Sequence, residues 1–217
     1  MIRYIKIGTR PSSLALKQVE EVKQLLPFFN FEVVVIKTKG DKDKKTPLAF
    51  KEGSDFFTYE IEAALLSGEI DLAVHSAKDL EDEIPKSLIV AALTKSISRA
   101  DCLVVRGNFT LDTLPKGSRI GTSSKNRKQA ILNYREDLVA LDIRGDIEER
   151  LAQVDCGKYD AVVMAKAALI RLGLEKRISQ IIPFSIIEPH HLQGRLAIQL
   201  FRKRDDLLEI IRRLNVN

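Results

Sequence analysis

The chain has 217 residues, of which 45% are hydrophobic and 30% charged, so it can bury cores and is not typical of a disordered protein. This length favours two domains. No apolar run approaches the roughly 18 residues of a membrane helix, and the first residues do not form a secretory signal. Two cysteines cannot supply a disulfide framework or a four-cysteine zinc site. We expect a cytoplasmic protein with no membrane partner and no metal.

The chain is mildly basic, with 35 Lys and Arg against 30 Asp and Glu and a formal net charge of +5. Its basic residues are interleaved with acidic ones, and tryptophan is absent. Nucleic-acid-binding proteins usually gather Lys and Arg on one face and add stacking aromatic side chains. We therefore expect a small ligand that carries carboxylate or phosphate groups, and no nucleic acid.

The first half of the chain alternates short β runs with amphipathic helical patterns. Phe31–Thr38 is a continuous run rich in β-branched residues, which is typical of a strand buried on both faces. Lys39–Lys51 is highly charged and lacks periodicity, which fits a solvated loop or a lid. The elements expected here are strand Arg3–Gly8, helix Ser12–Leu26 capped by Ser12, strand Phe31–Thr38, helix Thr58–Leu66, strand Ile70–Val74 and strand Leu88–Leu93.

A second series begins after 93–98, and it has the same alternation. The expected elements are strands Cys102–Val105 and Arg119–Thr122, helix Ser124–Tyr134, strand Leu138–Asp142, helix Ile147–Val154, strand Ala161–Met164, helix Ala167–Leu172, strand Leu196–Leu200 and helix Asp206–Leu214. Strands alternating with helices indicate an α/β protein with parallel sheets built from βαβ units. Such sheets bind ligands in the loops at the carboxyl ends of their strands.

Several of these loops carry residues suited to an anion. Arg10, Arg127, Arg144 and Arg150 lie in or just after Gly-, Ser- or Thr-containing turns, where a guanidinium group can bind a carboxylate through two hydrogen bonds. Ordinary solvated arginines are an equal alternative. No phosphate-binding glycine motif and no G-x-S-x-G nucleophile turn is present.

Other polar residues admit two interpretations. Asp79 follows an apolar strand, where a partly shielded carboxylate can hold a cation or move a proton; the spacing alone favours a helix cap or a surface ion pair. We expect His75 to serve packing and hydrogen bonding. The adjacent His190 and His191 should point to opposite faces of an extended segment. Cys102 should be buried at a strand start, and Cys156 should lie at a helix end.

Taken together, these loops resemble the porphobilinogen deaminase (hydroxymethylbilane synthase) family, the D-x-A-V-H-S-x-K-D stretch being the most specific. The matching stretches run in order along nearly the whole chain: Ile7–Gln18, 38–41, Phe57–Leu66, Asp71–Asp79, Gly121–Ser124, Ile143–Leu151, Tyr159–Gly173 and 193–194. The resemblance implies two domains like those of periplasmic binding proteins, with mixed, mostly parallel sheets, joined by two crossings around a cleft. The first would span Met1–Leu93 plus Pro189–Asn217, and the second Ser98–Phe184.

The resemblance also implies a transferase of tetrapyrrole (heme, porphyrin) biosynthesis that works as a monomer. The family condenses four porphobilinogen molecules into hydroxymethylbilane and releases ammonia each time, building the chain on a dipyrromethane cofactor attached to a cysteine. Asp79 matches the catalytic carboxylate that stabilises the cation left when ammonia departs, and Lys78 stands beside it. Positions that hold or support the cofactor and substrate carboxylates match Arg10, Ser12, Ser76, Thr122, Ser123, Ser124, Arg127, Arg144, Arg150 and Arg171.

Departures from the family pattern leave two functions open. The family's C-terminal domain, which bears the cofactor cysteine, has no counterpart before the chain ends at Asn217, and neither Cys102 nor Cys156 matches that cysteine. The paired arginines of the family are Asn126 and Arg127 here. The chain is then either a divergent deaminase or a non-catalytic relative that binds a small anionic pyrrole or another carboxylate ligand.

Overall fold

The computed structural model describes residues 4–43, 55–81 and 83–216. The chain forms two compact units. Among the described residues, unit 1 comprises 4–43, 55–81, 83–97 and 194–216, and unit 2 comprises 98–193. The chain thus leaves unit 1 after residue 97 and returns to it at residue 194.

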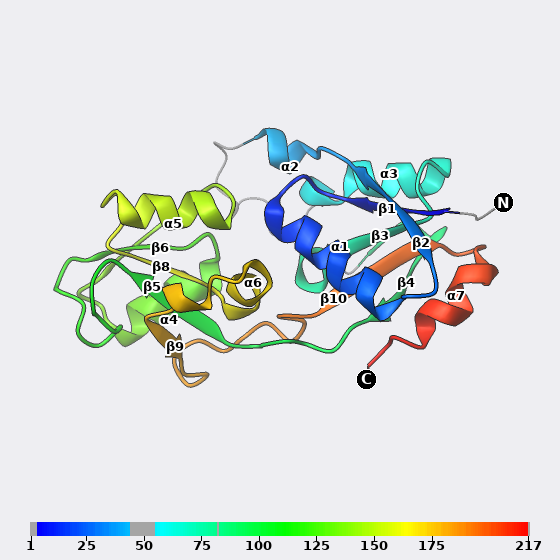
Figure 1. The fold of residues 1–217 in the computed structure, drawn as a ribbon. Coiled ribbons are helices and arrows are strands. Elements are labelled where there is room, and N and C mark those ends of the chain that lie inside the picture. The colour runs from blue at the N-terminus through cyan, green and yellow to red at the C-terminus, as the bar shows by residue number, and fades with distance from the viewer. Residues whose placement is uncertain (1–3, 44–54, 82, 217) are drawn as a thin grey trace. The chain divides into compact units, whose positions relative to one another are not determined.

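Unit 1 is a five-stranded sheet covered by helices on both faces. Its elements are β1 (Tyr4–Thr9), α1 (Ser13–Leu25), β2 (Asn30–Val35), α2 (Lys39–Lys42), the 3-10 turn Asp55–Phe57, α3 (Tyr59–Ser67), β3 (Leu72–Ser76), the 3-10 turn Ala77–Asp79, β4 (Leu88–Leu93), β10 (Leu196–Phe201) and α7 (Asp205–Arg212) (Figure 1). The strand order is β2-β1-β3-β10-β4.

The alternation of side chains along β3 shows how the unit 1 sheet builds two cores. Leu72 and Val74 join the core beneath α1 and α7, whereas Ala73 joins the core beneath α3. Successive side chains of a strand point to opposite faces, so one apolar strand serves both layers. Helix α1 contributes Val19 and Val22, which are fully or almost fully buried, to the first of these cores.

Unit 2 repeats this architecture with other residues. Its elements are β5 (Asp101–Val105), β6 (Arg119–Gly121), α4 (Lys125–Tyr134), β7 (Val139–Leu141), α5 (Ile147–Asp155), β8 (Ala161–Ala165), α6 (Lys166–Leu172), the 3-10 turn Glu175–Arg177 and β9 (Gln180–Ile182). The strand order is β7-β6-β8-β5-β9. Here α4 covers one face of the sheet, and α5 with α6 covers the other.

One strand in each sheet runs against the other four. β10 is antiparallel to β3 and β4, and β5 is antiparallel to β8 and β9. Each is the first strand after a crossing between the units: β5 follows the entry into unit 2, and β10 follows the return to unit 1. The α/β class with mixed, mostly parallel sheets is confirmed, but the alternation of helices and strands alone predicted no antiparallel strand.

Two further expectations need correction. The run Phe31–Thr38 is not a strand buried on both faces: β2 lies at the sheet edge, pairs with β1, and has no buried residue. Its β-branched residues instead form a half-covered edge. Of the segment Lys39–Lys51, the residues to Asp43 are described, and Lys39–Lys42 is one helical turn; the rest of the expected lid lies outside the described residues.

Candidate functional site

In unit 1, the predicted site residues follow two neighbouring parallel strands. Arg10 and Ser12 come directly after β1, and Ser76 ends β3, which pairs with β1 in parallel. Lys78 and Asp79 lie on the 3-10 turn that continues β3. Because parallel strands end at the same edge of a sheet, the structure brings these five residues to one edge of unit 1.

Arg10 is held by an acidic partner and an aromatic ring. Its Nε and Nη2 donate to Asp41 Oδ1 at 3.1 and 2.5 Å, and its guanidinium carbon lies 4.1 Å from the centroid of the Phe57 ring. Burial alone would raise the pKa of Asp41, but hydrogen bonds and charge from Arg10, with help from Thr38, lower it below its usual value. The carboxylate therefore stays ionised and fixes the direction of the Arg10 side chain.

Ser12 and Ser76 have hydrogen bonds within unit 1 that explain their positions. Ser12 Oγ accepts from the backbone N–H of Ala15 at 3.2 Å and caps α1, as the sequence predicted. Ser76 Oγ accepts from Gln18 Nε2 at 2.8 Å, which ties α1 to the end of β3. Each serine thus has a structural role, and ligand binding by either stays a prediction.

Asp79 is exposed, and it makes no hydrogen bond or ion pair with another described residue. The spacing favoured a helix cap or a surface ion pair, and neither is present among the described residues; the alternative, a partly shielded carboxylate, does not fit the exposed side chain. The Ala77–Asp79 turn carries the residue beyond the buried strand, since Ala77 is buried and Asp79 is not. A carboxylate without such a partner among the described residues is available to a cationic group of a ligand.

Behind this turn, three buried polar side chains form a chain of hydrogen bonds. Gln199 Nε2 donates to Glu62 Oε1 at 2.7 Å, so Gln199 Oε1 faces His75 Nε2 at 3.1 Å and accepts from it. Burial lowers the pKa of His75 to about 4, although Gln199 and the charge of Asp79 act in the opposite direction. His75 is therefore neutral at physiological pH and serves packing and hydrogen bonding, as predicted.

In unit 2, the loops after β6 and β7 are joined by hydrogen bonds. Ser123 Oγ donates to the backbone oxygen of Ile143 at 2.5 Å, and the N–H of Thr122 donates to Leu141 O at 2.9 Å. Ser124 caps α4, because its Oγ accepts from the N–H of Arg127 at 3.5 Å. The loop that holds the three predicted hydroxyl residues is thus fixed at the start of a helix, where backbone N–H groups favour an anion.

The loop after β7 depends on a glycine. Gly145 has φ +105°, and a Cβ there would lie 2.6 Å from Glu149 Oε2 and 2.8 Å from Glu149 Cβ. Glu149 in turn forms a capping box with Asp146 at the start of α5. Arg150 Nε donates to Gly145 O at 2.9 Å, and Gln153 Nε2 donates to Arg144 O at 3.0 Å. The turn and its two predicted arginines are therefore held together by hydrogen bonds.

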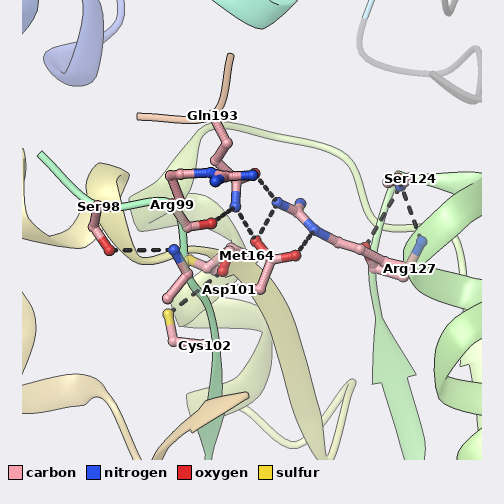
Figure 2. A network of polar contacts seen from close by, with 10 residues as sticks. Ser98, Arg99, Asp101, Cys102, Ser124, Arg127, Met164 and Gln193 are labelled. Carbon is pink, nitrogen blue, oxygen red and sulfur yellow. Dashed lines mark hydrogen bonds and ion pairs between the residues drawn. The ribbon is translucent and has the colours of Figure 1, made fainter. Parts of the chain in front are cut away.

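Arg127 has a different environment from the other predicted arginines. Its Nε and Nη2 donate to the two carboxylate oxygens of Asp101 at 2.8 and 2.6 Å, and Nη2 also donates to Gln193 Oε1 at 2.9 Å (Figure 2). Its side chain is 13% exposed. Arg171 lies in the last turn of α6 and not in a loop. The ligand roles of Arg127 and Arg171 stay predictions.

The two cysteines lie in the places that the sequence predicted. Cys102 is fully buried in β5, and burial, assisted by the charge of Asp101, raises the pKa of its thiol to about 12. Cys156 is exposed at the end of α5, whose other end starts at the Gly145 turn. Neither thiol therefore lies in a loop that carries the predicted anion-binding residues.

The histidine pair differs from its prediction. The rings of His190 and His191 do not point apart but stack, with centroids 4.6 Å apart and an angle of 28° between the planes. A turn follows directly at 191–194, so the backbone is not extended here. Across the described part of the chain, no group of three His, Cys, Asp or Glu side chains could hold a metal.

Sequence reasoning missed the partners that position the predicted residues: Asp41, Glu62, Asp101, Gln193 and Gln199. One signal was present for Gln199, which interrupts the apolar run Leu196–Leu200 and is fully buried. A polar residue in such a run needs a hydrogen-bond partner when it is buried. Asp101 begins an otherwise apolar strand in the same way, but nothing in the sequence pointed to Arg127 as its partner.

Comparison with known proteins agrees with this arrangement. Residues 5–209 match the family model described as "Porphobilinogen deaminase, dipyromethane cofactor binding domain". The chain is 40% identical to the porphobilinogen deaminase of Pelotomaculum thermopropionicum over 99% of this chain and 70% of that protein. It is 42% identical to that of Geobacillus kaustophilus, over 99% of this chain and 71% of that protein.

The fold also resembles solved binding proteins. The crystal structure of the methionine binding protein MetQ superposes with a TM-score of 0.59 at 12% identity, over 97% of this chain and 89% of that one. At such low identity the likeness shows the fold alone, which is that of periplasmic-binding-protein-like domains. With the family model matched along almost its whole length and relatives at about 40% identity, the chain belongs to the porphobilinogen deaminase family.

Proposed function

We propose that this chain condenses four porphobilinogen molecules into hydroxymethylbilane with release of ammonia, the transferase reaction of its family in tetrapyrrole biosynthesis. The observation that carries the proposal is Asp79. Its carboxylate lies exposed at the carboxyl end of β3, without a hydrogen bond or ion pair to another described residue. A free negative charge at a fixed place is what a reaction through a carbocation requires.

Asp79 acts on the pyrrole that loses ammonia. Departure of the amine leaves a positive charge on that ring, and a nearby carboxylate lowers the energy of the charged state. The same carboxylate accepts hydrogen bonds from pyrrole N–H groups and so orients the ring. His75, buried behind the turn and neutral, does not compete for the negative charge of Asp79.

The carboxylates of the pyrroles are bound by cations and hydroxyl groups. Each porphobilinogen carries an acetate and a propionate, so a growing chain of rings is a polyanion. In unit 2 the binding residues are Thr122, Ser123, Ser124, Arg144, Arg150 and Arg171, with Arg127 supporting them, and in unit 1 they are Arg10, Ser12, Ser76 and Lys78. Support comes from their positions: most lie at the carboxyl ends of parallel strands or at helix starts. We propose that the two units act as the two domains of the enzyme.

The donors of unit 2 fit the dipyrromethane that the family model names. Hydroxyl groups at the start of α4 and guanidinium groups beside the Gly145 turn are suited to its carboxylates. When bound, that cofactor supplies the pyrrole carbon to which the first substrate is joined. The covalent link does not fit either cysteine, because Cys102 is buried with a raised pKa and Cys156 lies at the far end of α5.

The cysteines also support a second candidate function. A chain that cannot fix a primer covalently would bind an anionic pyrrole or another small carboxylate without turnover. The same arginines and serines would serve that purpose, whereas Asp79 would have no cation to stabilise. The two functions therefore differ in whether Asp79 matters beyond ligand binding.

The test is to incubate the purified chain with porphobilinogen and measure ammonia release, with Asp79→Asn as the comparison. The enzyme requires ammonia release that Asp79→Asn abolishes or strongly reduces. Porphobilinogen binding by both proteins without ammonia release would establish the second function. Intact mass adds a separate readout, since a bound dipyrromethane raises the mass above 24.4 kDa and gives a red colour with an aldehyde reagent for pyrroles.

Other expectations stay predictions: that the chain works as a monomer, in the cytoplasm and without nucleic acid. Of the described helices, none has the length and apolarity needed to span a membrane. The observed mass in solution would test the first of them.

A further inference from the structure

A closed ring of hydrogen bonds joins three separate segments of unit 2 (Figure 2). Asp101 stands at the start of β5, just after the chain enters the unit, and Gln193 is the last residue before the chain leaves it. Arg127 lies in the first turn of α4. Arg127 contacts both of the others, and Gln193 Nε2 donates to Asp101 Oδ1 at 2.8 Å and to Arg99 O at 2.6 Å.

Almost all side-chain polar atoms of the residues in this ring form hydrogen bonds. Asp101 is 3% exposed and Gln193 is 2% exposed, so neither meets solvent. Both carboxylate oxygens of Asp101 accept from Arg127, and the amide group of Gln193 donates twice and accepts once. A buried carboxylate that lost its counter-charge would be strongly destabilised. Arg127 therefore cannot turn toward a ligand without leaving Asp101 unpaired.

Arg127 is also bound through its backbone. Its N–H donates to the Ser124 cap, and Ser124 and Ser123 belong to the loop that fits a ligand carboxylate. The side chain of Arg127 thus fixes the first turn of α4 from one side, while the cap fixes it from the other. A shift of the guanidinium group would move the start of the helix and with it the loop.

We propose that Asp101 and Gln193 are positioning residues, which act through Arg127 to hold the Gly121–Ser124 loop in the conformation that binds a ligand carboxylate. The proposal rests on the proposed function, since it concerns the same loop. It also links that loop to both segments at which the chain enters and leaves unit 2. The side chain of Arg127 holds the loop in place through Asp101 and Gln193 and does not contact the ligand.

The test is Gln193→Ala, which keeps both charges of the Asp101–Arg127 pair. Gln129→Ala is the matched control, because Gln129 lies exposed on the same helix and donates to Asn133, outside the ring. Hydrogen exchange is followed at the amides of Thr122, Arg127 and Lys128, which are hydrogen-bonded in the loop and first turn. Porphobilinogen affinity is measured by calorimetry.

We expect these amides to exchange about tenfold faster in Gln193→Ala, with the amides of β6 and β8 unchanged. The dissociation constant should rise about 3- to 10-fold, which corresponds to about 0.7–1.4 kcal/mol and to the loss of one hydrogen bond. A merely structural role would speed exchange throughout unit 2. Local exchange equal to that of Gln129→Ala would overturn the proposal. Exchange needs no ligand, so if neither the wild type nor Gln193→Ala binds porphobilinogen, the proposed function fails separately.

Asp101→Asn gives a second and opposite-signed test. If Arg127 holds the Gly121–Ser124 loop in place, loss of its carboxylate partner loosens the loop and weakens porphobilinogen binding. If Arg127 binds the ligand directly, release from Asp101 strengthens binding, and the proposal is wrong. Should Asp101→Asn fail to fold, the exchange measurement on Gln193→Ala decides the matter.

Discussion

The two units have the same architecture but carry different side chains at the carboxyl ends of their strands. Both have five strands in one topology, with the strand after the chain crossing antiparallel to the rest. In unit 1 the cation Arg10 is paired with Asp41, while the carboxylate of Asp79 has no such partner among the described residues. In unit 2 hydroxyl groups, helix starts and arginines gather instead. In the proposed function, Asp79 of unit 1 stabilises the cation of the reaction, and the arginines and hydroxyl groups of unit 2 bind carboxylates of the pyrroles.

The most direct way to break this comparison is Asp79→Asn. The variant keeps the shape of the side chain and removes its charge, so we expect turnover to fall roughly 10²–10³-fold, as on removal of one preorganised electrostatic group. Stability should be unchanged, because the residue is exposed. The initial rate of ammonia release per protein molecule is the measurement. Glu81→Gln, which removes a negative charge two residues later, is the control, and equal losses in both variants would show that Asp79 has no special role.

The buried polar chain of unit 1 should make stability depend on pH. The pKa of His75 is lowered from 6.5 to about 4, so the unfolded state binds a proton before the folded state does. The free energy of unfolding should therefore fall as the pH drops from about 6.5 to about 4, by at most about 3 kcal/mol at 1.36 kcal/mol per pKa unit. Denaturation in urea across this range would measure it.

His75→Gln should flatten that pH dependence, and His191→Gln, at an exposed histidine, should leave it unchanged. A titration of the imidazole by NMR in the wild type gives an independent check. A midpoint for His75 near 6.5 would contradict the burial argument.

Arg150→Gln tests whether the loops of unit 2 bind anions. We expect porphobilinogen to bind about tenfold more weakly, because a hydrogen bond to a charged group contributes about 1.5–3 kcal/mol and part of that is screened by water. The dependence of affinity on salt should also become shallower. Calorimetry at two ionic strengths measures both effects. Arg177→Gln, which removes a partly exposed arginine paired with Asp155, should change neither quantity.

The smallest expected effects are those of the helix caps, of which each unit has one at a serine. Ser12 accepts from its helix at 3.2 Å, and Ser124 accepts from its own at 3.5 Å. Loss of a cap usually costs about 1 kcal/mol, so Ser12→Ala should lower the free energy of unfolding by that amount and Ser124→Ala by less. Ser67→Ala, whose hydroxyl bonds a backbone oxygen within α3, is the control. A larger loss for Ser124 than for Ser12 would reverse the ranking.

Most of the fold followed from periodicity, whereas the details of the site did not. The predicted strand Leu88–Leu93 has the bounds of β4, and α1 differs from its predicted range by one residue at each end. Such elements can be predicted from the sequence because buried apolar residues recur with a regular period along the chain. β9 was missed, since three residues at a sheet edge give no period. The edge position of β2 was missed as well. A β-branched run has the same sequence pattern whether the strand pairs with one neighbour or with two.

Contacts between distant residues set the remaining differences. Asp101 and Gln193 are 92 positions apart, and Gln199 and Glu62 are 137 apart, so no local pattern links them. The loops that carry Arg144 and Ser123 could be predicted from turn residues beside strand ends. The partner of each arginine could not be predicted, because Arg127 and Arg150 follow similar turns and only the structure shows that Arg127 donates to the carboxylate of Asp101 and Arg150 to the backbone oxygen of Gly145.

The position of β10 has a consequence for synthesis on the ribosome. β10 lies between β3 and β4, and the residues that form it, Leu196–Phe201, are made last among the strands. Until then β3 and β4 have no strand between them, and the sheet of unit 1 stays split. Unit 2, by contrast, is continuous from 98 to 193 in the described chain. Because domains generally fold as units during synthesis, unit 2 can complete its fold before unit 1.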